Sequence, residues 1–156
     1  MPTDTRPASP RTVLPEAVWE RHANPWSGWS RAATTPLLVY ALYSRNRRLL
    51  AATLGWLVVN PAAFPPPTNT DAWMTRGVLA ERAWLRAGNG TVGVDWPNVL
   101  NLLNVPVTAW VGWAALRRRP VHTVVATALL MGLKMLWIDE IIQRTDADEF
   151  ERLHGD

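Results

Sequence analysis

The sequence of 156 residues contains no cysteine, so it has neither a disulfide nor a thiolate for catalysis or metal binding. Lysine is nearly absent as well: Lys134 is the only one, and the net charge of +3 therefore comes from arginine. The three histidines lie far apart in the chain, which gives no spacing for a His-rich metal site. Residues 1–15 have no apolar stretch of the kind that a cleaved signal peptide needs, and their composition predicts a disordered arm. What remains is a chain of apolar blocks separated by arginine-rich segments.

Four apolar blocks are present, and they determine the fold class that the sequence predicts. The last of them, residues 121–142, is long enough to cross a bilayer at about 1.5 Å per residue. Short basic turns follow the first and the third block, so the blocks pair into two antiparallel helical hairpins. We therefore expect an all-α integral membrane protein, a four-helix bundle with spans at residues 25–43, 49–64, 98–116 and 121–142.

A further helix is expected in the long connection between the second and third spans, at residues 71–87. Its apolar side chains recur at helical spacing and its arginines lie elsewhere on the surface, which suits an amphipathic helix in the membrane interface. A cap packed on the bundle fits the same pattern equally well. Together with the spans it makes one membrane domain, residues 16–143, followed by a polar, acidic tail at residues 144–156.

The orientation follows from charge. Both hairpin turns are basic, SRNRR at residues 44–48 and RRRP at residues 117–120, and the positive-inside rule places them in the cytoplasm. Both chain termini then lie outside. The ten tryptophans agree with a membrane location, since Trp is favoured at membrane–water interfaces. We expect a multi-pass protein of a cell membrane, with membrane lipids as partners and no nucleic acid.

With this topology, costly polar groups gather at the outer end of the bundle. A charge inside a span costs roughly 2.5–3.5 kcal/mol on insertion scales, and such a residue usually marks function. Lys134 is expected to pair with Glu81, and Arg31 with Asp139 or Glu140. The three carboxylates are also the candidate catalytic residues. The candidate ligand-binding residues are Arg31, Lys134, His22, Asn24, Asn60, Asn101, Trp26, Trp29, Trp84 and Trp137.

The stretch WERHANPWSGWSR, residues 19–31, resembles the opening signature of a family of small polytopic membrane proteins known only as a domain of unknown function. Looser matches are Asn60-Pro61, residues 64–67, Glu81 with Trp84, and Lys134 with Trp137 and Asp139. The resemblance covers about residues 17–142. It implies a multi-helix membrane fold and brings no activity and no cofactor.

The leading hypothesis is a protein that binds an amphipathic or lipid-like ligand at the outer end of the bundle. Arg31 and Lys134 would hold its anionic head, and Glu81 and Asp139 would orient these cations. Tryptophan would line the apolar side.

Three other hypotheses stay open. The first is a small membrane enzyme acting on a lipid or isoprenoid, with Glu81, Asp139 or Glu140 as general acid or base. The second is a structural subunit of a membrane complex, in which the polar groups only hold helices together. The third is a proton-coupled transporter, which would need a homo-oligomer because four spans alone do not enclose a path. His22 with one of the carboxylates can hold a metal ion, although no ligand spacing requires one.

Overall fold

The computed structural model describes residues 15–154, and every element in this range is an α-helix. The helices are α1 (Glu16–His22), α2 (Pro25–Ser44), α3 (Arg47–Ala63), α4 (Trp73–Arg86), α5 (Asn98–Leu116) and α6 (Pro120–His154). Residues 1–14 of the predicted N-terminal arm and residues 155–156 of the predicted tail lie outside the described residues. The rest of that tail does not separate from the last span, because α6 continues to His154 through a segment without Gly or Pro.

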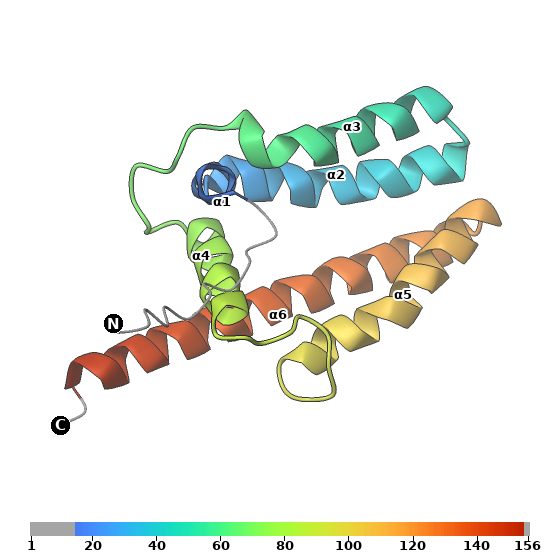
Figure 1. Cartoon of the computed structure of the whole chain (residues 1–156). Helices are drawn as coiled ribbons and strands as arrows, with labels where there is room; N and C mark the ends of the chain where they lie inside the picture. Colours follow the sequence, from blue (N-terminus) through green and yellow to red (C-terminus); the bar gives the residue numbers. More distant parts are fainter. Residues whose placement is uncertain (1–14, 155–156) are drawn as a thin grey trace, which may run out of the picture.

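The predicted first hairpin is present, and local side chains determine where it turns. The side chain of Asn24 starts α2 by accepting a hydrogen bond of 2.9 Å from the backbone N–H of Trp26. Arg45 ends the helix with a left-handed φ of 57°. Directly after it, the side chain of Asn46 caps α3 by accepting a hydrogen bond of 3.1 Å from the N–H of Leu49. The second hairpin joins α5 to α6 in the same antiparallel manner (Figure 1).

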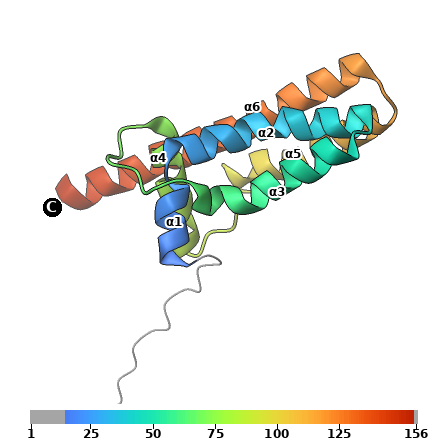
Figure 2. The ribbon, with the colours of Figure 1, turned by 90° about the horizontal axis from the view of Figure 1, so that it is seen from above.

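The two hairpins meet at two places. Near their turns, Val39 of α2 packs on Val111 and Ala115 of α5 and on Ala126 of α6. At the other end α4 runs across the molecule between the hairpins, where it packs on α6 and on α1 (Figures 1 and 2). The two hairpins therefore contact each other directly at one end, and α4 packs between them at the other end.

The apolar stripe of α4 faces the protein. Gly77 and Ala80 are buried, and Trp73 and Trp84 pack against the cluster formed by Trp137 of α6 and its neighbours. Of the two sequence-based alternatives for this helix, the structure corresponds to the cap packed on the bundle. Gly77 allows the close approach, because a Cβ there would lie 2.6 Å from the side chain of Ile138 on α6.

Two of the described helices are long and apolar enough to cross a membrane: α5, and α6 from Pro120 to Asp146. The other two predicted spans do not meet this test. α2 begins with polar residues, and α3 is 17 residues long and opens with two arginines. The all-helical class is thus confirmed, while four spans are not established by helix length and composition alone.

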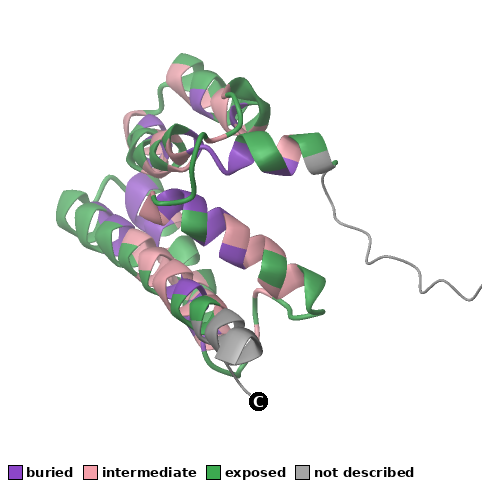
Figure 3. Ribbon diagram, turned by 90° about the vertical axis from the view of Figure 1, so that its left-hand side faces the viewer, coloured by how far each residue is buried: buried purple, intermediate pink, exposed green. Residues whose placement is uncertain are grey.

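Burial in α3 runs opposite to the usual pattern of a water-soluble helix. Its buried residues are the polar Thr53 and Asn60, whereas Leu54, Val58 and Val59 are exposed, Val58 by 79%. The outer faces of the hairpins are likewise largely exposed (Figure 3). Polar groups inside and apolar groups outside are what a helix in contact with lipid requires.

Candidate functional site

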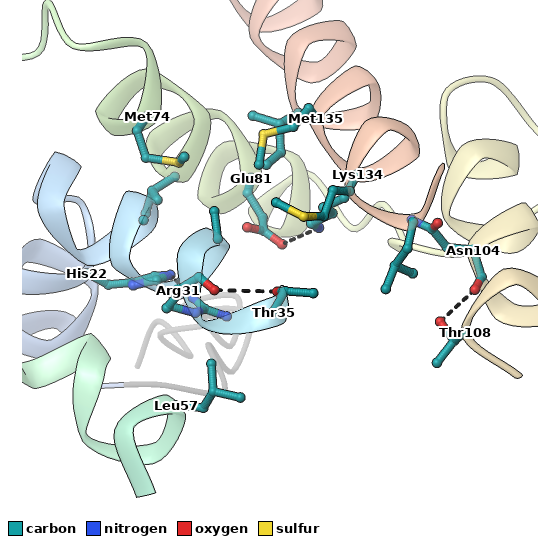
Figure 4. Close-up of a pocket in the computed structure, with 16 residues that line it drawn as sticks. His22, Arg31, Thr35, Leu57, Met74, Glu81, Asn104, Thr108, Lys134 and Met135 are labelled. Carbon is teal, nitrogen blue, oxygen red and sulfur yellow. Dashed lines mark hydrogen bonds and ion pairs between the residues drawn. The ribbon is translucent and has the colours of Figure 1, made fainter. Parts of the chain in front are cut away.

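A cavity of about 410 Å³ lies between the two hairpins, with α4 forming one wall. Charged and polar side chains line it from both hairpins and from α4, together with methionines of α4 and α6 (Figure 4). The lining residues are His22, Gly28, Arg31, Ala32, Thr35, Leu57, Met74, Val78, Glu81, Asn104, Thr108, Leu130, Met131, Lys134, Met135 and Ile138.

Lys134 is placed by α6 and faces α4. Its Nζ lies 3.9 Å from Oε1 of Glu81, so the ion pair expected from the sequence is present at the long end of the usual range. The same Nζ lies 4.0 Å from the ring centroid of Trp137, which is fully buried beneath it. A cation over an indole face is held by the ring quadrupole as well as by the carboxylate. Lys134 is therefore fixed at the cavity wall, with 42% of its side chain accessible.

Arg31 enters from the opposite hairpin, where it contacts a histidine and not a carboxylate. A guanidinium N–H donates to Nε2 of His22 at 2.7 Å. Arginine can only donate, so Nε2 must carry the lone pair and the ring proton must sit on Nδ1. That proton then donates to Oγ of Ser27 at 3.1 Å. The tautomer of His22 follows from the chemistry of its neighbour.

The hydrogen-bond chain continues from Ser27 into α3. The hydroxyl of Ser27 donates to Oδ1 of Asn60 at 2.9 Å, and Nδ2 of Asn60 donates to Oγ of Ser30 at 2.8 Å. Ser27 and Asn60 are both fully buried. This directed chain from Arg31 through His22 to Asn60 joins α1, α2 and α3 behind the cavity. It also excludes His22 as a base for Ser27, since the imidazole nitrogen that faces the hydroxyl carries the proton.

Burial and the adjacent positive charge both act on His22. The side chain is 6% exposed, and this burial, together with the guanidinium of Arg31, lowers the pKa of His22 from 6.5 to about 4. Both effects disfavour the imidazolium. His22 is therefore neutral at physiological pH, as its role as an acceptor for Arg31 requires.

The remaining ligand-binding candidates are not among the residues that line the cavity. Three of them donate hydrogen bonds to backbone carbonyls. The side chain of Asn24, which also caps α2, donates to Pro65, and the side chain of Asn101 donates to Thr91. The indole N–H of Trp84 donates to Gly90. Trp29 stacks on Trp73, Trp26 is 70% exposed, and Trp137 donates to Asn98. Of the ten predicted ligand-binding residues, the cavity wall includes His22, Arg31 and Lys134.

Two carboxylates proposed from the sequence have other partners. Asp139 accepts hydrogen bonds from the indole N–H of Trp73 at 3.0 Å and from the side chain of Gln143 at 2.7 Å. Glu140 accepts one from the indole N–H of Trp96 at 2.8 Å. The expected pairing of Arg31 with either carboxylate is wrong. Asp139 instead connects α6 to α4, and Glu140 connects α6 to the loop between α4 and α5. Among the residues that line the cavity, the carboxylate is Glu81.

The sequence-based selection missed the methionines. Met74, Met131 and Met135 all line the cavity, and they are three of the four methionines in the chain. A thioether on a flexible stem adapts to apolar groups of different shape, which makes methionine common on binding surfaces. The sequence does carry a signal in α6, because Met131 and Met135 are four residues apart and Met131 and Lys134 are three apart, which are helical spacings.

Asn104 also lines the cavity, although it was not among the ten predicted ligand-binding residues. Its Oδ1 is buried without a hydrogen-bond partner in the protein, so α5 carries an unsatisfied acceptor beside the cavity. Within the part of the chain whose side chains are described, no group of three or more His, Asp or Glu residues is close enough to hold a metal ion.

The fold and the cavity define an all-helical protein that has two helices able to span a membrane and a cationic site between two hairpins. The chain belongs to DUF6653, a family of unknown function, whose model matches residues 5–147. Membership confirms the expectation of a family of unknown function, and it assigns no activity. Neither a curated protein nor a solved structure matches the chain.

Proposed function

We propose that this chain is a four-span membrane protein that binds the anionic head of an amphipathic, lipid-like ligand in the cavity between its hairpins. The spans are α2, α3, α5 and the apolar part of α6. One observation carries the ligand proposal: Arg31 and Lys134 reach the same cavity from opposite hairpins, and Glu81 is the carboxylate between them.

The exposed faces of α2 and α3 support their immersion in lipid. Leu37 and Tyr40 on α2, and Val58 on α3, are exposed, while the buried positions of these helices include Ser27 and Asn60. At about 1.5 Å per residue α3 is roughly 25 Å long, close to the ~30 Å of a hydrocarbon core. Each of these helices is paired with its hairpin partner, so neither needs the apolarity of a lone span.

The arrangement of the turns supports the orientation. The α2–α3 turn and the α5–α6 turn lie at the same end of the molecule (Figures 1 and 2). Both are arginine-rich and exposed, with arginines at 45, 47, 48 and 117–119. Under the positive-inside rule this end faces the cytoplasm, and α4, the cavity mouth and both termini face the other side.

The charge in the cavity supports an anionic head. The two cations Arg31 and Lys134 and the carboxylate of Glu81 give the cavity lining a net charge of +1, to which the neutral His22 adds nothing. His22 occupies one of the five N–H donors that a guanidinium carries. A carboxylate or phosphate would complete the charge balance through charge-assisted hydrogen bonds, each contributing about 1.5–3 kcal/mol.

The test is mass spectrometry of what the protein retains after purification in mild detergent. Arg31→Gln and Lys134→Met each remove a charge and keep most of the volume, so the retained anionic lipid should fall by about 10- to 100-fold. The matched control is Arg48→Gln, an exposed arginine at the hairpin turn. Unchanged retention in both cavity variants would reject the proposal.

Catalysis on the same ligand is the second candidate, and the position of Glu81 favours it. Its carboxylate faces Lys134 inside the cavity, where a general acid or base would have to be. Incubating the protein with a lipid extract distinguishes the two functions. An enzyme generates new masses that disappear in Glu81→Gln while the bound lipid remains, whereas a binding protein leaves the extract unchanged.

A further inference from the structure

A second, apolar groove of about 440 Å³ runs between α2 and α6 from the cavity toward the hairpin turns. It meets the cavity at Met131, which lines both. The residues along it are Pro36, Val39, Tyr40 and Tyr43 of α2, and Pro120, Thr123, Val124, Thr127, Ala128 and Met131 of α6.

The two threonines do not make this groove polar. The hydroxyl of Thr123 donates to the carbonyl of Arg119 at 2.8 Å, and the hydroxyl of Thr127 donates to the carbonyl of Thr123 at 2.7 Å. Both donors are satisfied by backbone carbonyls, one of the residue before α6 and one of α6 itself. With Val124 and Ala128 beside them, the α6 wall offers no free hydroxyl donor, and most of the groove surface suits an apolar occupant.

The length of the groove suits one hydrocarbon chain. From Lys134 to Thr123 the axis of α6 rises about 16 Å, at ~1.5 Å per residue. One leaflet, half of the ~30 Å hydrocarbon core, gives an acyl chain a reach of about 15 Å. The groove also runs along the helices, parallel to the chains of surrounding lipids if α6 spans the membrane.

We infer that the groove between α2 and α6 holds the hydrocarbon chain of the ligand whose anionic head lies between Arg31 and Lys134. This inference rests on the proposed function and narrows it: the ligand is a lipid with one hydrocarbon chain bound against the protein, and this chain runs from the cavity toward the hairpin turns. Met131 lies where head and chain join.

The experiment uses the purified full chain in nanodiscs with a defined probe, a long-chain alkyl phosphate carrying a photoactivatable diazirine near its methyl end. After irradiation, peptide mass spectrometry locates the adducts. They should concentrate on groove residues such as Tyr40 and Val124, and an excess of unlabelled alkyl phosphate should reduce them at least fivefold. Ala128→Phe, which fills the groove, should reduce them to the same extent. The matched control Ala109→Phe makes the same substitution at an exposed position on α5 outside both lining sets, and should leave them unchanged.

Three other results would overturn the inference, and they are distinguishable from one another. Adducts spread evenly over exposed residues such as Val58 and Leu103 would mean that ordinary surrounding lipid, and no bound chain, lies against the protein. If unlabelled short-chain alkyl phosphate still binds in a manner that depends on Arg31 and Lys134, but groove adducts are missing, the head site stands and the groove assignment fails. If no alkyl phosphate binding depends on the two cations, the proposed function itself fails.

Discussion

The hydrogen bond from Ser27 to Asn60 predicts an energetic coupling between α2 and α3 that a double-mutant cycle can measure. Both side chains are fully buried, and their oxygens are 2.9 Å apart. Ser27→Ala leaves the Nδ1–H of His22 and Oδ1 of Asn60 without partners, and Asn60→Ala removes the acceptor of Ser27 and a donor to Ser30.

The magnitude follows from these losses. A buried polar group left without a partner costs about 1–3 kcal/mol, so each single variant should lower the free energy of unfolding by about 2–3 kcal/mol. The double variant removes both ends of the shared bond. It should therefore be less destabilised than the sum of the two singles, by about 1 kcal/mol, within the range measured for residues in contact.

The assay is reversible unfolding in mixed detergent micelles, followed by helical circular dichroism for the four proteins of the cycle. The exposed Asn69→Ala serves as a control for the loss of an amide, with an expected change within about 0.5 kcal/mol. Strict additivity of Ser27→Ala and Asn60→Ala would show that the two side chains do not interact and would refute the directed chain built on them.

Three further predictions follow from the structure. The pKa of His22 is about 4 when folded and near 6.5 when unfolded, so its contribution to stability is complete above pH 6.5. It should decline by up to about 3 kcal/mol as the pH falls from 6.5 to 4, and this part of the pH dependence should disappear in His22→Gln. Gly77→Ala places a Cβ 2.6 Å from a side chain of α6 and should cost about 1–3 kcal/mol, whereas Gly112→Ala meets nothing within 4 Å and should be neutral or stabilising in thermal unfolding. Single cysteines introduced at Asn46 and Asn89 should react with impermeant thiol reagents from opposite sides of sealed vesicles, and labelling from the same side would contradict the proposed topology.

The hairpins and the central ion pair could be predicted because their signals are local or nearly unique. Apolar blocks separated by basic turns indicate antiparallel helices whatever the detailed packing. Lys134 is the only lysine and lies in an apolar helix, so it needed a carboxylate, and Glu81 in the connecting helix was the expected one. The order of apolar and charged residues along the chain is sufficient for both conclusions.

The partners of Arg31, Asp139 and Glu140 could not be predicted, because they depend on rotation about helix axes. Charge suggests that an arginine and two carboxylates at the same level pair with one another. In the structure the carboxylates face the indole N–H groups of Trp73 and Trp96, and Arg31 faces an imidazole. Tryptophan in a membrane protein is expected to anchor the chain at the membrane surface. This expectation does not include the indole N–H as a hydrogen-bond donor to a carboxylate.

In the proposed four-span, ligand-binding protein, the transverse position of α4 separates ligand selectivity from membrane insertion. Met74, Val78 and Glu81 lie at helical spacing on α4 and contribute one wall of the cavity, yet none belongs to a proposed span. Exchanging these three side chains can reshape the chamber while leaving the hydrophobic length and the pairing of all four spans untouched. Relatives could thus diverge in what they accept by altering a single short helix, with the scaffold in the bilayer unchanged.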